Sequence, residues 1–137
     1  MVDQKYFEPV VEAMYKVVEA GTATQAKIKD ITVCGKTGTA QNPHGEDHSV
    51  FIAFAPKDNP KIAVSVYVEN AGFGGQWAAP IASLMIEKYL RGKISDTIKE
   101  NRILDAVILN LEIPKGGITK AYLDSLNAGL KMKRYEY

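Results

Sequence analysis

Apolar residues recur at helical spacing near the start of the chain. Positions three or four residues apart give one apolar face between residues 7 and 18, and Glu12 lies four residues before Lys16. Both patterns predict an amphipathic helix, which Gly21 would end. The following residues, 22–30, are polar and typical of a linker. The apolar face consists of Phe7, Val10, Val11, Met14 and Val18.

Three segments rich in β-branched residues follow and predict strands at 31–40, 49–55 and 61–69. In the third segment, apolar residues at 62, 64, 66 and 68 alternate with other residues, which is the period of a strand. The connections QNPHGEDH and PKDNP are short and rich in turn residues. We therefore expect consecutive strands to pair antiparallel.

A glycine-rich loop, NAGFGGQ, separates the last strand from a second predicted helix at 77–91. Pro80 suits the first turn of this helix, and Gly92 would end it. The order helix, three strands, helix predicts the α+β class. We expect a three-stranded antiparallel sheet covered by helices, with both helices on one face.

Residues 93–137 have a different pattern. An apolar segment, RILDAVILNLEI, fits no single type of element and ends at Pro114. A last helix is predicted from about Thr119 to the basic residues at 131–134. We therefore expect two parts, a sheet-and-helix unit at 1–92 and a C-terminal extension with a helical tail at 93–137.

The composition excludes several functions. The chain has 137 residues, of which 46% are hydrophobic and 24% charged, as in an ordinary globular domain. Its formal net charge of +1 gives no electrostatic reason to expect nucleic acid as a partner. One cysteine excludes an intrachain disulfide and a cysteine-based zinc site. No apolar run reaches the ~18 residues of a membrane span, and the first residues lack the pattern of a signal peptide.

The most informative string is CGKTGTAQ, which runs from Cys34 to Gln41. Two glycines in a strand suggest that something approaches the backbone closely. A lysine and two threonine hydroxyls suit an anion such as a carboxylate, although an ordinary polar strand end is an alternative interpretation. A phosphate-binding loop, GxxxxGK[ST], is disfavoured. Its first glycine would fall on Asp30, and a strand and turn follow where that motif needs a helix.

Around this string the chain resembles a known family. The motifs, in order and at the family's spacing, are KTGTAQ at 36–41, NPHG at 42–45, His48, FIAFAP at 51–56, NPKIAV at 59–64, VEN at 68–70, GG at 74–75 and AAPIA at 78–82. Together they resemble the C-terminal part of the transpeptidase domain of class B penicillin-binding proteins, most closely the elongation-type penicillin-binding protein 2 group. The resemblance covers about residues 6–92, and 93–137 are not recognised as part of it.

The resemblance implies a part of the penicillin-binding/β-lactamase-like transpeptidase fold and a mechanism. Such enzymes cross-link peptidoglycan by acyl transfer from a D-Ala-D-Ala stem peptide, and β-lactams acylate the same serine. By resemblance, Lys36 is a catalytic lysine that polarises the serine of an SxN motif. The Thr37 and Thr39 hydroxyls would bind the carboxylate of substrate or β-lactam. The Thr39 N–H would be one oxyanion-hole donor, typically worth ~3–4 kcal/mol. Gly38 would leave room for the substrate backbone. No cofactor and no metal is implied.

The chain departs from the family because the SxxK and SxN motifs that should precede KTG are absent. No serine precedes Lys36, and no later serine has a lysine three residues on. Ser125-Leu126-Asn127 matches the letters of SxN, but it lies on the wrong side of KTG. We therefore expect an inactive C-terminal fragment of a longer serine-type D-Ala-D-Ala transpeptidase. The alternative is a stand-alone, non-catalytic module that binds peptidoglycan or a partner.

The fragment interpretation has consequences for partners and location. The parent enzyme would bind stem peptides and β-lactams, and the remainder of its transpeptidase domain would pack on this chain. Without that remainder the strand at 31–41 would be an exposed edge, which favours pairing between copies into a homo-oligomer. We expect the parent in the bacterial inner membrane with a periplasmic catalytic domain, and this chain by itself to be soluble.

Three further features have ordinary structural explanations that we prefer. The loop with His44, Glu46, Asp47 and His48 suits turns and hydrogen bonds better than a metal ion. Cys34 suits a small buried side chain better than a reactive thiol. For Trp77, core packing at a helix start is preferred to a place beside a cleft.

Overall fold

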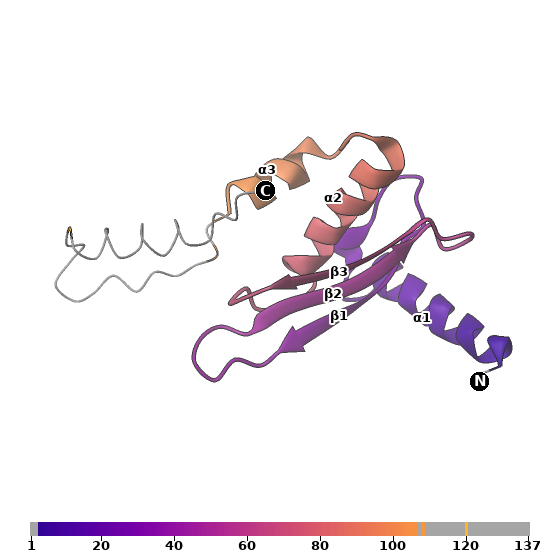
Figure 1. Ribbon diagram of the computed structural model, residues 1–137, viewed down its shortest axis with the longest axis horizontal. Helices are drawn as coiled ribbons and strands as arrows, with labels where there is room; N and C mark the ends of the chain where they lie inside the picture. Colours follow the sequence, from indigo (N-terminus) through magenta and orange to yellow (C-terminus); the bar gives the residue numbers. More distant parts are fainter. Residues whose placement is uncertain (1–2, 107, 109–119, 121–137) are drawn as a thin grey trace, which may run out of the picture.

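The computed structural model describes residues 3–106, 108 and 120. Its three strands form one antiparallel sheet in the order β1-β2-β3, with helices beside it (Figure 1). The elements in chain order are η1 (Gln4–Tyr6), α1 (Phe7–Glu19), η2 (Thr24–Ala26), β1 (Cys34–Ala40), β2 (His48–Ala55), β3 (Ile62–Val68), α2 (Ala78–Arg91) and α3 (Thr97–Leu104). The α+β class and the antiparallel order of the strands are therefore confirmed.

The predicted boundaries hold to about one residue except at the start of β1. The sequence predicts this strand from residue 31, but it begins at Cys34. Asp30 has a left-handed φ of 61°, and the Ile31 N–H donates to the carbonyl of Ile28 at 3.2 Å. This turn occupies residues 28–31, so Ile31 does not extend the strand. Gly92 ends α2 as predicted, in a left-handed conformation with φ 73°.

The sheet has two different faces, which the register defines. On β2, Ser49, Phe51, Ala53 and Ala55 are buried, and we call their side of the sheet the inner face. The intervening residues point to the outer face, where Ile52 is 49% exposed. Because Lys36 pairs with Ile52 and Thr37 pairs with Phe51, the side chain of Lys36 lies on the outer face and that of Thr37 on the inner face.

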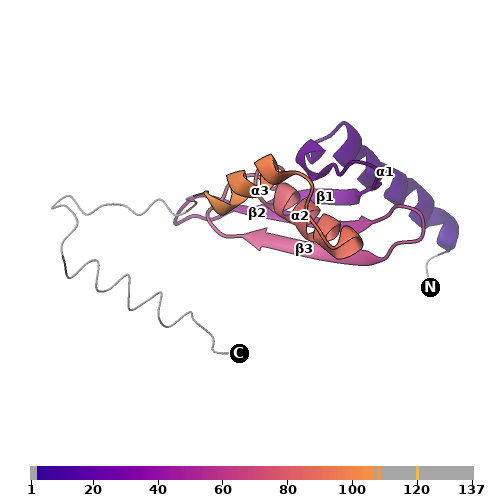
Figure 2. The same cartoon turned by 90° about the horizontal axis from the view of Figure 1, so that it is seen from above.

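The core lies between the inner face and α2, which crosses it (Figure 2). Ala78, Ala79 and Ala82 are fully buried, so small side chains let the helix approach the strands closely. Gly35 serves the same close packing on β1. A Cβ at this position would lie 2.3 Å from the Phe51 ring, which fills the centre of the core. The first glycine of the CGKTGTAQ string is therefore explained by packing.

The prediction that both helices cover one face is wrong for α1. This helix lies beside β1, on the other side of the sheet from α2 (Figure 1). Its side chains Pro9, Val10, Ala13, Met14 and Val17 form an apolar groove together with Lys36 and Ile52 of the outer face. The hydrophobic pattern identifies the apolar face of a helix but not the face of the sheet that receives it.

The short helix α3 is anchored by polar contacts instead of a buried apolar face. Asp96 caps its first turn by accepting from the Lys99 N–H at 2.9 Å. The Lys99 ammonium donates to the carbonyl of Lys27 at 3.2 Å and to Ser83 Oγ at 3.3 Å. The predicted last helix, from about 119, falls almost entirely outside the described residues. No helix within the described part of the chain is long and apolar enough to cross a membrane.

Candidate functional site

A groove runs beside β1, between this strand, the segment around η2 and the glycine-rich loop before α2. We call it the threonine groove. Its volume is about 460 Å³, and it is open to solvent. β1 is an edge strand that pairs only with β2 in the described sheet. The groove is lined by Thr22, Thr24, Gln25, Thr37, Thr39, Phe73, Gly74, Gly75 and Gln76.

The predicted site residues divide between the two faces of the sheet. Thr37 and Thr39 both line the threonine groove. The Thr37 hydroxyl lies 2.8 Å from the hydroxyl of Thr22, whereas Thr39 is exposed. Lys36 is on the outer face, and its ammonium donates to the carbonyl of Thr37 at 2.7 Å. The groove therefore holds hydroxyl groups and lacks the lysine, which is directed to the opposite side of the strand.

Gly38 lies between the two threonines on β1, and its backbone supports the opposite wall of the groove. Gly74 packs so closely that a Cβ there would lie 2.6 Å from the Gly38 carbonyl and 2.2 Å from the Val50 carbonyl. Any side chain at Gly74 would therefore push the glycine-rich loop away from β1. At Gly38 itself, a Cβ would meet only the Val50 side chain at 3.3 Å.

Ser49 holds this loop in position, a role that the sequence does not reveal. It is fully buried on the inner face, opposite Thr39 in the register. Its hydroxyl donates to the carbonyl of Phe73 at 3.0 Å and accepts from the Ala78 N–H at 3.0 Å. The second contact caps α2, which has no cap from its own Trp77 side chain. The available signal was a polar residue at an inward position of a strand.

The segments at the β1–β2 end of the groove are tied together by hydrogen bonds. Asp47 accepts from the Asn42 N–H at 3.0 Å, and Asn42 donates to Asn70 Oδ1 at 2.7 Å. His48 Nδ1 accepts from the Asn70 N–H at 3.0 Å. The preferred interpretation of this loop, turns and hydrogen bonds, agrees with these contacts. Among the described residues, no three His, Cys, Asp or Glu side chains are grouped to hold a metal ion.

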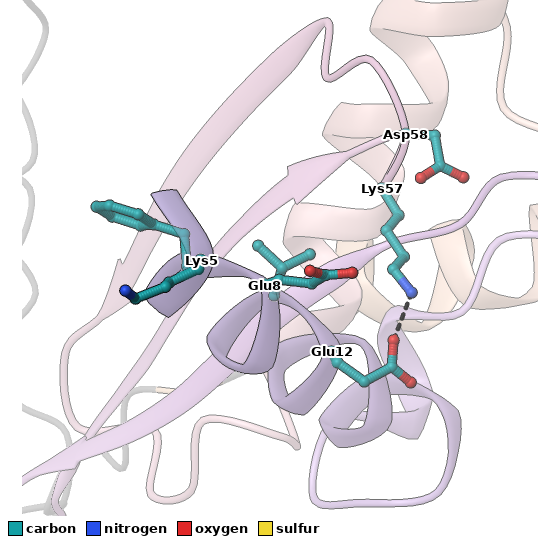
Figure 3. Close-up of a pocket in the computed structure, with 7 residues that line it drawn as sticks. Lys5, Glu8, Glu12, Lys57 and Asp58 are labelled. Carbon is teal, nitrogen blue, oxygen red and sulfur yellow. Dashed lines mark hydrogen bonds and ion pairs between the residues drawn. The ribbon is translucent and has the colours of Figure 1, made fainter. Parts of the chain in front are cut away.

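A second, charged groove lies between α1 and the β2–β3 turn, away from the threonines (Figure 3). In it the Lys57 ammonium donates to Glu12 at 2.5 Å and lies 4.7 Å from the centre of the Tyr15 ring. This hydrogen bond lowers the pKa of the Glu12 carboxyl and raises the pKa of the Lys57 ammonium. Both groups stay charged near neutral pH and neutralise each other, so the pair fastens α1 to the sheet and offers no acid or base for catalysis.

Two buried titratable groups have structural roles as well. Burial raises the pKa of the Cys34 thiol, so Cys34 stays protonated and is a small buried side chain, as predicted. Burial also acts to raise the pKa of Glu87 on α2. The hydrogen bonds from Ser95 and the ion pair with Arg91 outweigh this effect, and the pKa is lowered. Glu87 thus remains ionised and joins the end of α2 to the segment before α3.

Trp77 is neither fully buried in the core nor fully exposed beside a cleft. It is half-buried, and the Arg102 guanidinium of α3 lies 5.8 Å from the centre of its ring. Arg102 also donates to Gln25 Oε1 at 2.8 Å, at the edge of the threonine groove. The segment 22–30, predicted as a linker, therefore supplies one wall of the groove. No local sequence signal indicates this, because the contacts of the segment come from far along the chain.

Comparison with known proteins gives this geometry a family context. The family described as penicillin binding protein transpeptidase domain matches residues 1–87. The peptidoglycan D,D-transpeptidase MrdA of Haemophilus influenzae is 37% identical over 113 residues, which cover 69% of this chain and 17% of that protein. Stage V sporulation protein D of Bacillus subtilis is 32% identical, with 88% of this chain and 24% of that protein covered. The chain thus spans less than a quarter of either relative.

Solved structures agree with the sequence matches. Penicillin-binding protein A from Mycobacterium tuberculosis, in a ceftriaxone acyl-enzyme complex, is 34% identical with a TM-score of 0.60 over 66% of this chain and 22% of that chain. PBP2 of Pseudomonas aeruginosa, in complex with WCK 5153, is also 34% identical with a TM-score of 0.60. It matches 71% of this chain and 22% of its own. The resemblance identified from the KTGTAQ motif is confirmed.

Proposed function

Because this chain belongs to the penicillin-binding protein transpeptidase family, we propose that it forms one side of a peptidoglycan D,D-transpeptidase site. The complete enzyme would join stem peptides by acyl transfer from a D-Ala-D-Ala peptide to an acceptor amine. The observation that supports this most directly is the pair of threonines, Thr37 and Thr39, side by side on an edge strand that lines an open groove. An extended peptide can lie along such an edge, while hydroxyl groups bind its carboxylate.

Each site residue has a proposed role. The Thr37 and Thr39 hydroxyls donate to the carboxylate of the stem peptide or a β-lactam, and Thr37 is oriented by its 2.8 Å contact with Thr22. The Thr39 N–H stabilises the oxyanion of the tetrahedral intermediate. Gly38 leaves the backbone open to the substrate. Because Lys36 projects to the outer face, we infer that the serine it polarises approaches β1 from that side.

The chain alone cannot complete the reaction, because it has no nucleophile in an SxxK motif and no SxN motif before KTG. We propose that these motifs belong to the remainder of the transpeptidase domain. The outer face is suited to receive that remainder, since Ile52 and Tyr67 are 49% and 53% exposed there. In isolation, the same face and the β1 edge favour association between copies. The division at residue 92 stays a prediction.

The location of the complete enzyme follows from the proposed reaction. Peptidoglycan is cross-linked outside the inner membrane, so we propose that the catalytic domain faces the cell wall on the periplasmic side. The stand-alone alternative, a module that binds peptidoglycan without catalysis, would use the same groove but no acyl-enzyme.

Covalent labelling with a fluorescent penicillin tests this proposal. The 137-residue chain should remain unlabelled after denaturing electrophoresis, whereas the full-length parent should become labelled at a serine upstream of KTG. In the parent, Thr37→Val with Thr39→Val should slow acylation by about tenfold or more, because two hydroxyl contacts to the carboxylate are lost. Stable labelling of the chain alone would show that a nucleophile is present in it. A parent that is not labelled would overturn the transpeptidase proposal and favour the binding module.

A further inference from the structure

Three elements that are far apart in the sequence meet at one end of the threonine groove. Gln25 of η2 lines the groove, Trp77 precedes α2, and Arg102 belongs to α3. Arg102 donates to Gln25 Oε1 at 2.8 Å, and its guanidinium lies 5.8 Å from the centre of the Trp77 ring. None of these contacts involves a residue of the KTGTAQ motif.

The chemistry of this contact fixes the orientation of the Gln25 amide. A glutamine side chain has one carbonyl oxygen that accepts and one NH₂ group that donates, whereas a guanidinium can only donate. Arg102 therefore occupies the carbonyl oxygen. The NH₂ group is left as the free end of a side chain that lines the groove.

Arg102 is restrained by a contact at its guanidinium and by the anchoring of the helix that carries it. The Trp77 ring supports its guanidinium by a cation–π contact. On α3, Lys99 anchors the helix to the carbonyl of Lys27 and to Ser83 Oγ. Figure 2 shows α3 next to α2, at the same side of the sheet. An anchored helix makes the guanidinium a fixed donor instead of a freely moving surface side chain.

The groups around this end of the groove are complementary to an oxygen-rich ligand. The Thr37 and Thr39 hydroxyls and the Gln25 NH₂ group can all donate hydrogen bonds. Arg102 takes part in no ion pair among the described residues, so its positive charge is free to attract an anion.

We propose that Gln25 is a ligand-contacting residue of the threonine groove and that Arg102 is its positioning residue. The Gln25 NH₂ group donates to an oxygen of the bound acyl-donor peptide, either its terminal carboxylate or a peptide carbonyl. This inference rests on the proposed transpeptidase function. It also assigns a role at the site to α3, which lies beyond the residues that the family model matches.

The test is an NMR titration of the ¹⁵N-labelled 137-residue chain with Nα-acetyl-L-Lys-D-Ala-D-Ala. We expect the backbone amides of Thr37 and Thr39 and the side-chain amide of Gln25 to shift with one dissociation constant. Arg102→Ala should weaken binding about three- to tenfold, the effect of one neutral hydrogen bond. A parallel titration with the C-terminal carboxamide distinguishes the oxygens. A Gln25 shift that persists indicates a peptide carbonyl, and one that disappears while Thr37 and Thr39 still shift indicates the carboxylate.

Gln25→Glu separates ligand contact from a purely structural role. The new carboxylate would keep or strengthen the contact with Arg102, but it would present an acceptor to the ligand oxygen. We therefore expect binding to weaken more than tenfold while the dispersion of the spectrum is unchanged. Asn101→Asp adds the same charge at an exposed position on α3 and should leave binding within about twofold of the unmutated 137-residue chain.

The outcomes distinguish this inference from the function on which it rests. If Thr37 and Thr39 shift while the Gln25 side chain does not, the role of Gln25 is overturned and the groove keeps its proposed function. The same conclusion follows if Gln25→Glu binds the peptide as well as the unmutated 137-residue chain does. If none of the three shifts at millimolar peptide, both the proposed peptide site and the role of Gln25 are overturned.

Discussion

Ser49→Ala is expected to destabilise the chain more than any other loss of a single hydroxyl in the described core. The Ser49 hydroxyl joins the Phe73 carbonyl and the Ala78 N–H, which belong to the glycine-rich loop and to the first residue of α2. Ser49 and Ala78 are both fully buried. Removal of the hydroxyl therefore leaves the buried Ala78 N–H without its partner, and it also takes the partner of the Phe73 carbonyl, which belongs to a residue that is 71% exposed.

The magnitude follows from those two groups. A buried polar group that loses its partner costs about 1–3 kcal/mol. The Ala78 N–H bears this cost in full and the more accessible Phe73 carbonyl bears less, so the expected loss is about 2–3 kcal/mol in the free energy of unfolding. For an ordered region of about 100 residues, 1 kcal/mol changes the melting temperature by about 4–8 °C. The melting temperature should therefore fall by about 10 °C or more.

Urea denaturation followed by circular dichroism measures this difference, and Ser83→Ala is the matched control. Ser83 is equally buried. Its hydroxyl accepts from the Lys99 ammonium at 3.3 Å, a group that keeps its contact with the Lys27 carbonyl, and it donates at 2.7 Å to the Pro80 carbonyl within α2. That carbonyl keeps its helical partner when the hydroxyl is lost, so we expect a cost of about 1 kcal/mol. The reasoning would be refuted if the free energy of unfolding of Ser49→Ala stayed within about 0.5 kcal/mol of that of the unmutated chain. It would also be refuted if Ser49→Ala lost no more stability than Ser83→Ala.

Three other changes have defined outcomes. Gly74→Ala should cost about 3 kcal/mol in urea denaturation, because the new Cβ would overlap the Val50 and Gly38 carbonyls; an unchanged midpoint would contradict the close packing. Gly92→Ala should cost only about 1–2 kcal/mol, since φ is 73° but nothing lies within 4 Å of the new Cβ. The pKa of Glu87 is lower in the folded chain than its unfolded value near 4.5, so the ionised carboxylate stabilises the fold above about pH 4.5. This stabilisation is lost as the pH falls through the folded pKa. The stability advantage over Glu87→Gln should therefore be present at pH 7 and shrink below about pH 4.5, and a constant advantage from pH 7 to 3 would contradict it.

The elements were predictable because their signals are local. Alternation at 62–68, the short PKDNP link and the Gly92 stop each act within a few residues, and each prediction is confirmed. The start of β1 was not predictable from β-branched residues, because the left-handed turn at Asp30 overrides the strand preference of Ile31. The side of the sheet that α1 covers also has no local signal, since an amphipathic helix can pack on either face.

The candidate site was predictable in part. The KTGTAQ motif identified Thr37 and Thr39, which line one groove, and strand alternation puts Lys36 on the face opposite to them. Which of these faces is the inner one became known only from the register. Gln25 and Ser49 depend on contacts to residues 77 and 24 positions away. Only the folded chain brings those groups together, so spacing in the sequence could not reveal them.

The segment 22–29 is held by side chains that come much later in the chain, and this affects the order in which the protein is built. Arg91 donates to the Lys29 carbonyl, Lys99 to the Lys27 carbonyl and Arg102 to Gln25, over separations of 62, 72 and 77 residues. At about 5–20 residues per second of synthesis, about 3–15 s pass between the synthesis of this segment and the synthesis of the side chains that contact it. During that interval the segment beside the threonine-lined strand lacks its contacts with the side chains of α2 and α3. The proposed peptide groove is therefore complete only after the α3 segment has left the ribosome.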